Sequence, residues 1–199
     1  RILDALDRLG LKENTLVVFT SDHGEMLGDL DTYQKFLPYD ASAKIPMVVR
    51  YPGHVKPGER RSYFVDLNDL LPTFLDEAGL EYPADYDLPG ESIFVGDGRK
   101  NRKYQYMEHQ RNNKRWCCLR DERYKYVYYY GDAEQLFDLK EDPSETVNLL
   151  WEEKVSPEIT AVRDRLKAAL LAYERRYGLK GYAGPKGFKE MERYHAQPY

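Results

Sequence analysis

Residues 15–36 read "TLVVFTSDHGEMLGDLDTYQKF", an apolar, β-branched run that ends abruptly in an acid and a histidine placed side by side. The run is typical of a strand buried on both faces, as in a parallel sheet beneath helices. In open α/β sheets, ligands bind beyond the carboxyl ends of the strands, which is where Asp22 and His23 stand. Carboxylate and imidazole groups are both metal ligands, and Gly24 gives the chain freedom to turn sharply. The stretch therefore predicts a strand that leads into a metal site, with a helix cap or a plain turn as the alternative.

The order of the predicted elements divides the chain into three parts. In residues 1–82, a helix over about residues 1–9 precedes the strands "TLVVFTS" and "KIPMVVRYP", and a second helix spans "VDLNDLLPTFLDEAGL". This part is predicted to be α/β with parallel strands. Residues 83–178 contain "YQYMEHQ", "KRWCCLRDE", "RYKYVYYYG" and "AEQLFDLK", which predict an antiparallel sheet, and "SPEITAVRDRLKAALLAYERRYG", which predicts a helix packed on it. Residues 179–199, rich in Gly, Pro and aromatic residues, are predicted to form an extended tail.

Charge and hydropathy argue against two classes of partner. The 199-residue chain carries a formal net charge of -4, so no global positive field draws it to nucleic acid or to an anionic membrane. No stretch is long and apolar enough to span a bilayer. Two local basic runs, residues 99–103 and 111–115, are typical of solvated loops, with contact to a polyanion as the alternative. Cys117 and Cys118 are adjacent in a predicted strand, and one of them is expected to face the core as a small hydrophobe.

Several separate motifs, in a fixed order, together resemble a known family. They are "TLVVFTSDHGEMLGD", the lysine of "DTYQKFLPYDAS", the strand segment "KIPMVVRYPG", the helix "DLNDLLPTFLDEAGL" and the turn "QLFDLKEDPSETVNL". With them the chain resembles the C-terminal portion of a type I sulfatase, an arylsulfatase-like member of the alkaline-phosphatase superfamily. The resemblance covers almost the whole chain up to about residue 177. It implies the C-terminal part of a mixed, mainly parallel α/β sheet flanked by helices, followed by a small antiparallel sheet with a packed helix.

The resemblance also implies roles for four residues. Asp22 would be a carboxylate ligand of a divalent metal ion, usually Ca2+ in sulfatases, with Mn2+ and Mg2+ as other candidates. His23 would touch the same metal or the ester oxygen. Lys35 would bind a sulfate oxygen and stabilise the charge that develops in the transition state; taken alone it would be an ordinary surface lysine. His109 would lie on a strand edge facing the substrate pocket, with a solvated loop histidine as the alternative. The implied substrate is a sulfated small molecule or carbohydrate.

Two departures from the family pattern concern the nucleophile and the pocket. The family nucleophile is a formylglycine made from Cys or Ser in a C/S-x-P-x-R motif, and the 199 residues contain no such motif. We expect it in upstream sequence, so the chain alone is predicted to be inactive. Leu30 stands where many relatives have a histidine, so the leaving-group side of the pocket differs.

Two other functions remain open at this point. The first is a phosphonate or phosphate ester hydrolase of the same superfamily, and the second is a catalytically silent module that binds anions or a partner. The sequence upstream of residue 1 would separate the silent module from the two enzymes, and substrate screening would separate the enzymes from each other. A homo-oligomer held by the C-terminal tail is a further expectation.

Overall fold

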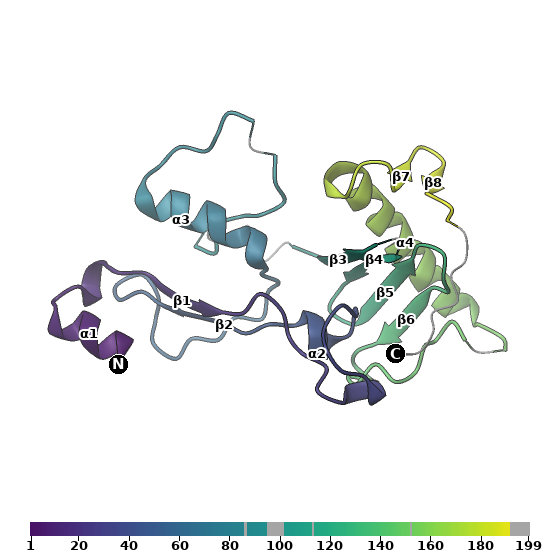
Figure 1. Cartoon of the computed structure of the whole chain (residues 1–199), viewed down its shortest axis with the longest axis horizontal. Helices are drawn as coiled ribbons and strands as arrows, with labels where there is room; N and C mark the ends of the chain where they lie inside the picture. Colours follow the sequence, from purple (N-terminus) through teal and green to yellow (C-terminus); the bar gives the residue numbers. More distant parts are fainter. Residues whose placement is uncertain (86, 95–101, 113, 152, 192–199) are drawn as a thin grey trace.

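The structure is a computed structural model that describes residues 1–85, 87–94, 102–112, 114–151 and 153–191. Figure 1 shows α1, β1, β2 and α3 gathered at one end of the molecule, and the sheet β3–β6 with α4 at the other. None of the helices in the described ranges is both long and apolar enough to cross a membrane. The helices and 3-10 turns are α1 (Ile2–Arg8), η1 (Lys12–Asn14), η2 (Asp29–Asp31), α2 (Asp40–Ala43), η3 (Leu67–Asp69), α3 (Leu70–Ala78) and α4 (Pro157–Tyr177). The strands are β1 (Val17–Thr20), β2 (Met47–Arg50), β3 (Gln105–Arg111), β4 (Lys114–Arg120), β5 (Tyr124–Tyr129), β6 (Gln135–Asp138), β7 (Ala183–Gly184) and β8 (Gly187–Phe188).

The two strands of the first half, β1 and β2, pair with each other in an antiparallel ladder. The prediction that they run parallel and are buried on both faces is therefore wrong for this pair. Phe19 and Val48 are cross-strand partners and are 66% and 60% exposed, so one face of the ladder carries little cover from the described residues. An apolar run predicts a strand, but the direction of the neighbouring strand depends on the connection between them, which the run does not contain.

The 3-10 turn η3 runs directly into helix α3; a capping box marks the start of η3, and a glycine marks the end of α3. The Asp66 carboxylate accepts a hydrogen bond from the Asn68 N–H at 2.8 Å, and the Asp69 carboxylate accepts one from the Asp66 N–H at 2.8 Å, which together make a capping box. Gly79 ends the helix in the left-handed conformation, with φ of 64°. Arg102 then binds the buried Asp69 with a 2.6 Å ion pair, so the capping box of η3 is tied to the segment that enters β3.

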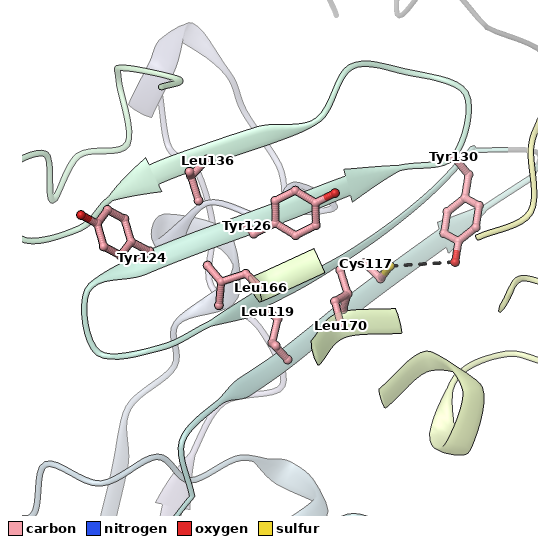
Figure 2. Packing of buried hydrophobic residues seen from close by; sticks show 8 residues of the cluster. All are labelled: Cys117, Leu119, Tyr124, Tyr126, Tyr130, Leu136, Leu166 and Leu170. Carbon is pink, nitrogen blue, oxygen red and sulfur yellow. Dashed lines mark hydrogen bonds between the residues drawn. The ribbon is translucent and has the colours of Figure 1, made fainter. Parts of the chain in front are cut away.

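The second half is a four-stranded antiparallel sheet in the order β3-β4-β5-β6, with α4 packed on one face. Ser156 caps α4 by accepting a hydrogen bond from the Ile159 N–H at 3.2 Å. Leu166 and Leu170 of α4 are fully buried, and Figure 2 shows them lying over the strands of the sheet. Burying each leucine contributes about 1.5–3 kcal/mol. The predicted α/β class, with a small antiparallel sheet and a packed helix, is confirmed.

The opposite face of this sheet is covered by the segment that follows residue 35. Tyr39 packs against the buried cluster on that face, with its ring centre 5.8 Å from that of Phe137. Because side chains alternate along β4, Cys117 belongs to the cluster under α4 and Cys118 to the cluster under Tyr39. Both cysteines are fully buried, whereas the sequence analysis expected only one in the core.

The described part of the C-terminal tail is folded rather than extended as predicted. β7 and β8 form a two-stranded hairpin, and the ring of Phe188 stacks on Tyr128 with centroids 4.0 Å apart. Arg175 of α4 donates two hydrogen bonds to the Gly184 carbonyl, at 3.0 and 2.8 Å. The aromatic residues of the tail therefore extend the core at one end of the sheet, because they bury more apolar surface there than in solvent. Residues 192–199 lie outside the described ranges, and the limits of the three predicted domains stay a prediction.

Candidate active site

The turn after β1 is held by its own polar groups. Ser21 Oγ donates a hydrogen bond to the His23 carbonyl at 2.7 Å, and the His23 N–H donates one to Asp22 Oδ1 at 3.0 Å. Hydrogen bonds from its own backbone N–H and from that of His23 lower the pKa of Asp22. The Asp22 side chain is 82% exposed. An ionised carboxylate therefore projects into open space at the end of β1.

The ring of His23 presents one nitrogen beside that carboxylate. Its Nδ1 lies 2.6 Å from the Gly24 carbonyl oxygen. Because a carbonyl only accepts, Nδ1 holds the proton of the neutral ring, and Nε2 keeps its lone pair. Nε2 lies 3.6 Å from Asp22 Oδ2. Two ligand atoms at right angles around one divalent ion, each about 2.1–2.5 Å from it, are about 3.0–3.5 Å apart, so Asp22 and His23 fit as neighbouring metal ligands.

This pair would be an incomplete ligand set. Over the ranges that the structure describes, no group of three or more His, Cys, Asp or Glu side chains is placed to hold a metal ion. A divalent ion takes at least four ligands, and six or more when it is calcium. The remaining ligands would therefore be backbone or amide carbonyls, groups outside the described residues, the substrate or water.

Gly24 is required here by a close approach of two backbones. Its N–H donates to the Ser42 carbonyl at 2.7 Å, and the next N–H, that of Glu25, donates to the Ala41 carbonyl at 2.9 Å. A Cβ on Gly24 would lie 2.1 Å from the Ala41 oxygen, which no side chain can tolerate. The sequence analysis explained this glycine by a sharp turn. The structure gives a different reason: the backbone of α2 lies so close to Gly24 that a side chain has no room there.

Lys35 lies in a loop with an unusual concentration of backbone strain. On either side of it the chain is anchored: the Met26 N–H donates to the Gln34 carbonyl at 2.9 Å, and Trp116 Nε1 donates to the Phe36 carbonyl at 2.7 Å. Positive φ angles at residues other than glycine persist only where the surroundings enforce them, and they cluster at functional sites. Five such residues lie in this loop, with φ from 50° to 89°: Leu27, Leu30, Asp31, Gln34 and Phe36. Nothing in the sequence indicates this strain.

The ring of Phe36 brings together side chains from two distant segments. Lys35 Nζ lies 5.6 Å from the ring centroid, and the imidazole of His109 on β3 lies 4.9 Å from it. Arg111 Cζ lies 5.2 Å from the same centroid. The structure thus brings the predicted residues Lys35 and His109 to one ring. Within the described residues, however, no hydrogen bond or ion pair joins Lys35 to Asp22 or His23.

The basic run 111–115 divides into two different environments. Arg115 is 1% exposed and binds Glu174 of α4 at 2.8 Å and Glu108 at 2.5 Å, so the expectation of a solvated loop is wrong for this residue. Arg111 is exposed at the end of β3. Arg111 could not be singled out from the sequence of the run, because position in the sheet decides which arginine is buried.

The segment between Lys35 and α2 is fastened to the sheet by a buried charge cluster. Lys125 of β5 is fully buried, and its Nζ contacts Asp40 Oδ1 at 2.5 Å and Glu145 Oε1 at 2.6 Å. Burial opposes ionisation of Asp40, but the ammonium of Lys125, helped by Arg120, outweighs it and lowers the pKa of Asp40. Asp40 is therefore a structural anion at the N-terminus of α2.

Comparison with known proteins identifies the family. A family model described as "N-sulphoglucosamine sulphohydrolase, C-terminal" matches residues 28–175. The chain belongs to the sulfatase family. It is 33% identical over 160 residues to an N-acetylglucosamine-6-O-sulfatase of Bacteroides thetaiotaomicron, which covers 75% of this chain and 29% of that protein. It is 31% identical over 193 residues to an arylsulfatase of Clostridium perfringens, covering 92% of this chain and 40% of that protein. The chain thus spans well under half of these sulfatases.

Solved structures give the same fold. A protein in complex with its substrate D-glucosamine-2-N,6-O-disulfate superimposes with a TM-score of 0.79 at 29% identity, covering 89% of this chain and 37% of that one. A phosphonate monoester hydrolase of Agrobacterium radiobacter superimposes with a TM-score of 0.76 at 30% identity, covering 96% of this chain and 42% of that one. The predicted resemblance to the C-terminal portion of an alkaline-phosphatase-like sulfatase is confirmed.

Proposed function

We propose that this chain supplies the metal-binding turn and the sulfate-binding lysine of a sulfuric ester hydrolase whose formylglycine nucleophile lies in upstream sequence. The observation that carries the proposal is the pairing of an ionised Asp22 carboxylate with the Nε2 atom of His23, which lies 3.6 Å from it. Membership of the sulfatase family supports the reaction class. The missing C/S-x-P-x-R motif is the reason that the nucleophile is assigned to another part of the protein.

Each of the proposed residues has a distinct task. Asp22 and His23 would hold a divalent metal, which supplies electrophilic stabilisation of the ester oxygens when it is bound. Calcium is the ion that the family resemblance favours, with Mn2+ or Mg2+ as alternatives. The ammonium of Lys35 binds a sulfate oxygen as a point charge and offsets the negative charge that builds up as the ester bond breaks. His109 lines the side of the pocket that receives the substrate.

The substrate that fits the relatives best is a sulfated carbohydrate. One relative is named for a 6-O-sulfated amino sugar, and one structural neighbour is bound to a disulfated glucosamine. The similar fold of a phosphonate monoester hydrolase supports a second candidate, hydrolysis of phosphonate esters, for which the same metal and lysine would serve. The two candidates can be separated by measuring how fast the longer protein hydrolyses a sulfate ester and a phosphonate ester of the same phenol.

Calorimetric titration of Ca2+ and of Mn2+ into the chain tests the metal-binding turn directly. Asp22→Asn should weaken binding at least tenfold, because it removes the only charged ligand of the pair. Asp31→Asn is the matched control, since Asp31 is an exposed acid of the following loop and should leave the affinity unchanged. Equal affinity in the two variants would remove Asp22 as a ligand. If the longer protein then hydrolysed neither ester, the chain would be a silent binding module.

A further inference from the structure

Three side chains around Phe36 have no acidic partner. Within the described residues, neither Lys35 nor Arg111 forms a hydrogen bond or an ion pair, and the buried Nε2 of His109 has no hydrogen-bond partner. Three other arginines in or beside the same sheet form ion pairs with acids. The pairs are Arg115 with Glu174, Arg120 with Asp40 and Arg123 with Asp138. The end of the sheet near Phe36 is thus the place where positive charge is left uncompensated.

The sheet fixes the relative position of these groups. β3 is an edge strand, and His109 is the cross-strand partner of Trp116, on the face covered by the segment after Lys35. Arg111 is two residues further along β3, so it shares that face. Lys35 Nζ and Arg111 Cζ lie 5.6 and 5.2 Å from the same ring centroid. The two charges are therefore close enough for two substituents of a single sugar ring to reach both of them.

We propose that Arg111, together with His109, forms a subsite for a second sulfate group on the sugar whose reacting sulfate is bound by Lys35. This inference rests on the proposed function, because it takes Lys35 as the residue that binds the reacting group. It makes the preferred substrate a doubly sulfated sugar. Arg111 is then a specificity residue, since it holds a group that does not react.

The chemistry of each side chain suits this task. The planar guanidinium offers two parallel N–H donors, which match two oxygens of one sulfate, and the face of Phe36 orients it through a cation–π contact. Burial, followed by the charge of Arg111, lowers the pKa of His109, so its ring is neutral near pH 7. A neutral ring with an unpartnered buried nitrogen accepts or donates one hydrogen bond to a sugar hydroxyl or sulfate oxygen.

The test compares the binding of two probes, N-acetylglucosamine 6-sulfate, which has no charged group at position 2, and glucosamine 2-N,6-O-disulfate, to the chain by calorimetry. The wild-type chain should bind the disulfate about tenfold to a hundredfold more tightly, which is the effect of one hydrogen-bonded charge pair. Arg111→Gln should abolish that preference and weaken binding of the monosulfate far less than binding of the disulfate. Arg111→Lys keeps the charge but loses the two parallel N–H donors of the guanidinium, so it should retain only part of the preference.

Arg8→Gln is the matched control, because Arg8 is an exposed arginine on α1, at the far end of the molecule in Figure 1. This variant changes the net charge equally and should keep the preference. Equal affinity of the wild-type chain for the two probes, failure to bind the disulfate, or equal behaviour of Arg111→Gln and Arg8→Gln would each overturn the proposal. Binding requires no hydrolysis, so an inactive enzyme would refute the proposed function without changing this result.

Discussion

Replacing Lys125 with methionine is expected to destabilise the folded chain strongly. The ammonium of Lys125 is fully buried and contacts the Pro38 carbonyl at 3.0 Å, Asp40 at 2.5 Å and Glu145 at 2.6 Å. Methionine fills a similar volume but carries no charge. The variant would therefore leave two carboxylates close together, with Glu145 still accepting the Asp40 N–H at 2.5 Å.

The size of the destabilisation depends on which cations remain beside the two carboxylates after Lys125 is replaced. Removing one partner of a buried ion pair costs about 3–5 kcal/mol, because the other charge is left uncompensated. Asp40 retains Arg120 at 3.3 Å and the exposed Lys44 at 3.8 Å, so the lower end, about 3 kcal/mol, applies. With a urea dependence of about 2 kcal/mol per molar, the midpoint of unfolding should fall by about 1.5 M.

The loss should also depend on pH. Burial raises the pKa of Glu145 even beside Lys125, whereas the pKa of Asp40 is lowered. Asp40 therefore contributes stability that is present above its unfolded pKa of about 3.9 and is lost as the pH falls through its folded value. Without Lys125, both carboxylates take up protons at higher pH in the folded state, which removes their mutual repulsion. The difference in the free energy of unfolding between wild type and Lys125→Met should therefore narrow as the pH falls from 7 toward 4.

Urea unfolding measures these differences, followed by far-UV circular dichroism and by the fluorescence of the buried Trp116. Lys154→Met is the control, because Lys154 is exposed and should shift the midpoint very little. Adding Glu145→Gln to Lys125→Met removes one of the two uncompensated carboxylates and should recover part of the loss. A Lys125→Met midpoint equal to that of Lys154→Met, or a difference that does not change with pH, would refute this account of the cluster.

Three other predictions concern the site and the surface of the first half. Gly24→Ala places a Cβ 2.1 Å from the Ala41 oxygen, so it should lower stability by at least about 1–3 kcal/mol and weaken calorimetric binding of Ca2+. The 199 residues alone should not turn over 4-nitrophenyl sulfate; repeated turnover would show that the nucleophile lies within them. Exposed Phe19 and Val48 should make the chain self-associate in light scattering, and Phe19→Lys should reduce this, whereas a monodisperse wild-type chain would contradict the expectation.

The parts of the fold that could be predicted from sequence are those determined by neighbouring residues. Ser156 before Pro157 and Gly79 after α3 mark helix ends by chemistry that acts over a few positions. Three strands of the second half were likewise predicted from their aromatic content and the turn residues between them, and the fourth as a short strand before the turn at Asp142 and Pro143. The direction of β2 relative to β1 could not be predicted in this way, since it depends on the whole path of the chain between them.

The candidate site was predicted by resemblance more than by spacing. An acid and a histidine after a strand are compatible with a simple turn, and Lys35 alone is an ordinary lysine. What distinguishes this turn and this lysine from ordinary ones is their surroundings, which are built by contacts between distant segments. Lys125 meets Asp40 across 85 residues, and Glu145 meets the backbone of Asp40 across 105. No local pattern shows that these residues are neighbours, so neither their burial nor their pairing could be predicted.

These distant contacts indicate how the second half of the chain positions the turn of Asp22 and His23, which belongs to the first half. Lys125 and Glu145 hold Asp40 at the start of α2, and the carbonyls of Ala41 and Ser42 in α2 accept the N–H groups of Glu25 and Gly24. Each of these links is short and leaves no room for water. A shift of α2 must therefore move the turn that carries Asp22 and His23. Substitutions in the buried charge cluster should consequently weaken metal binding at the turn, although none of its side chains touches the proposed ligands.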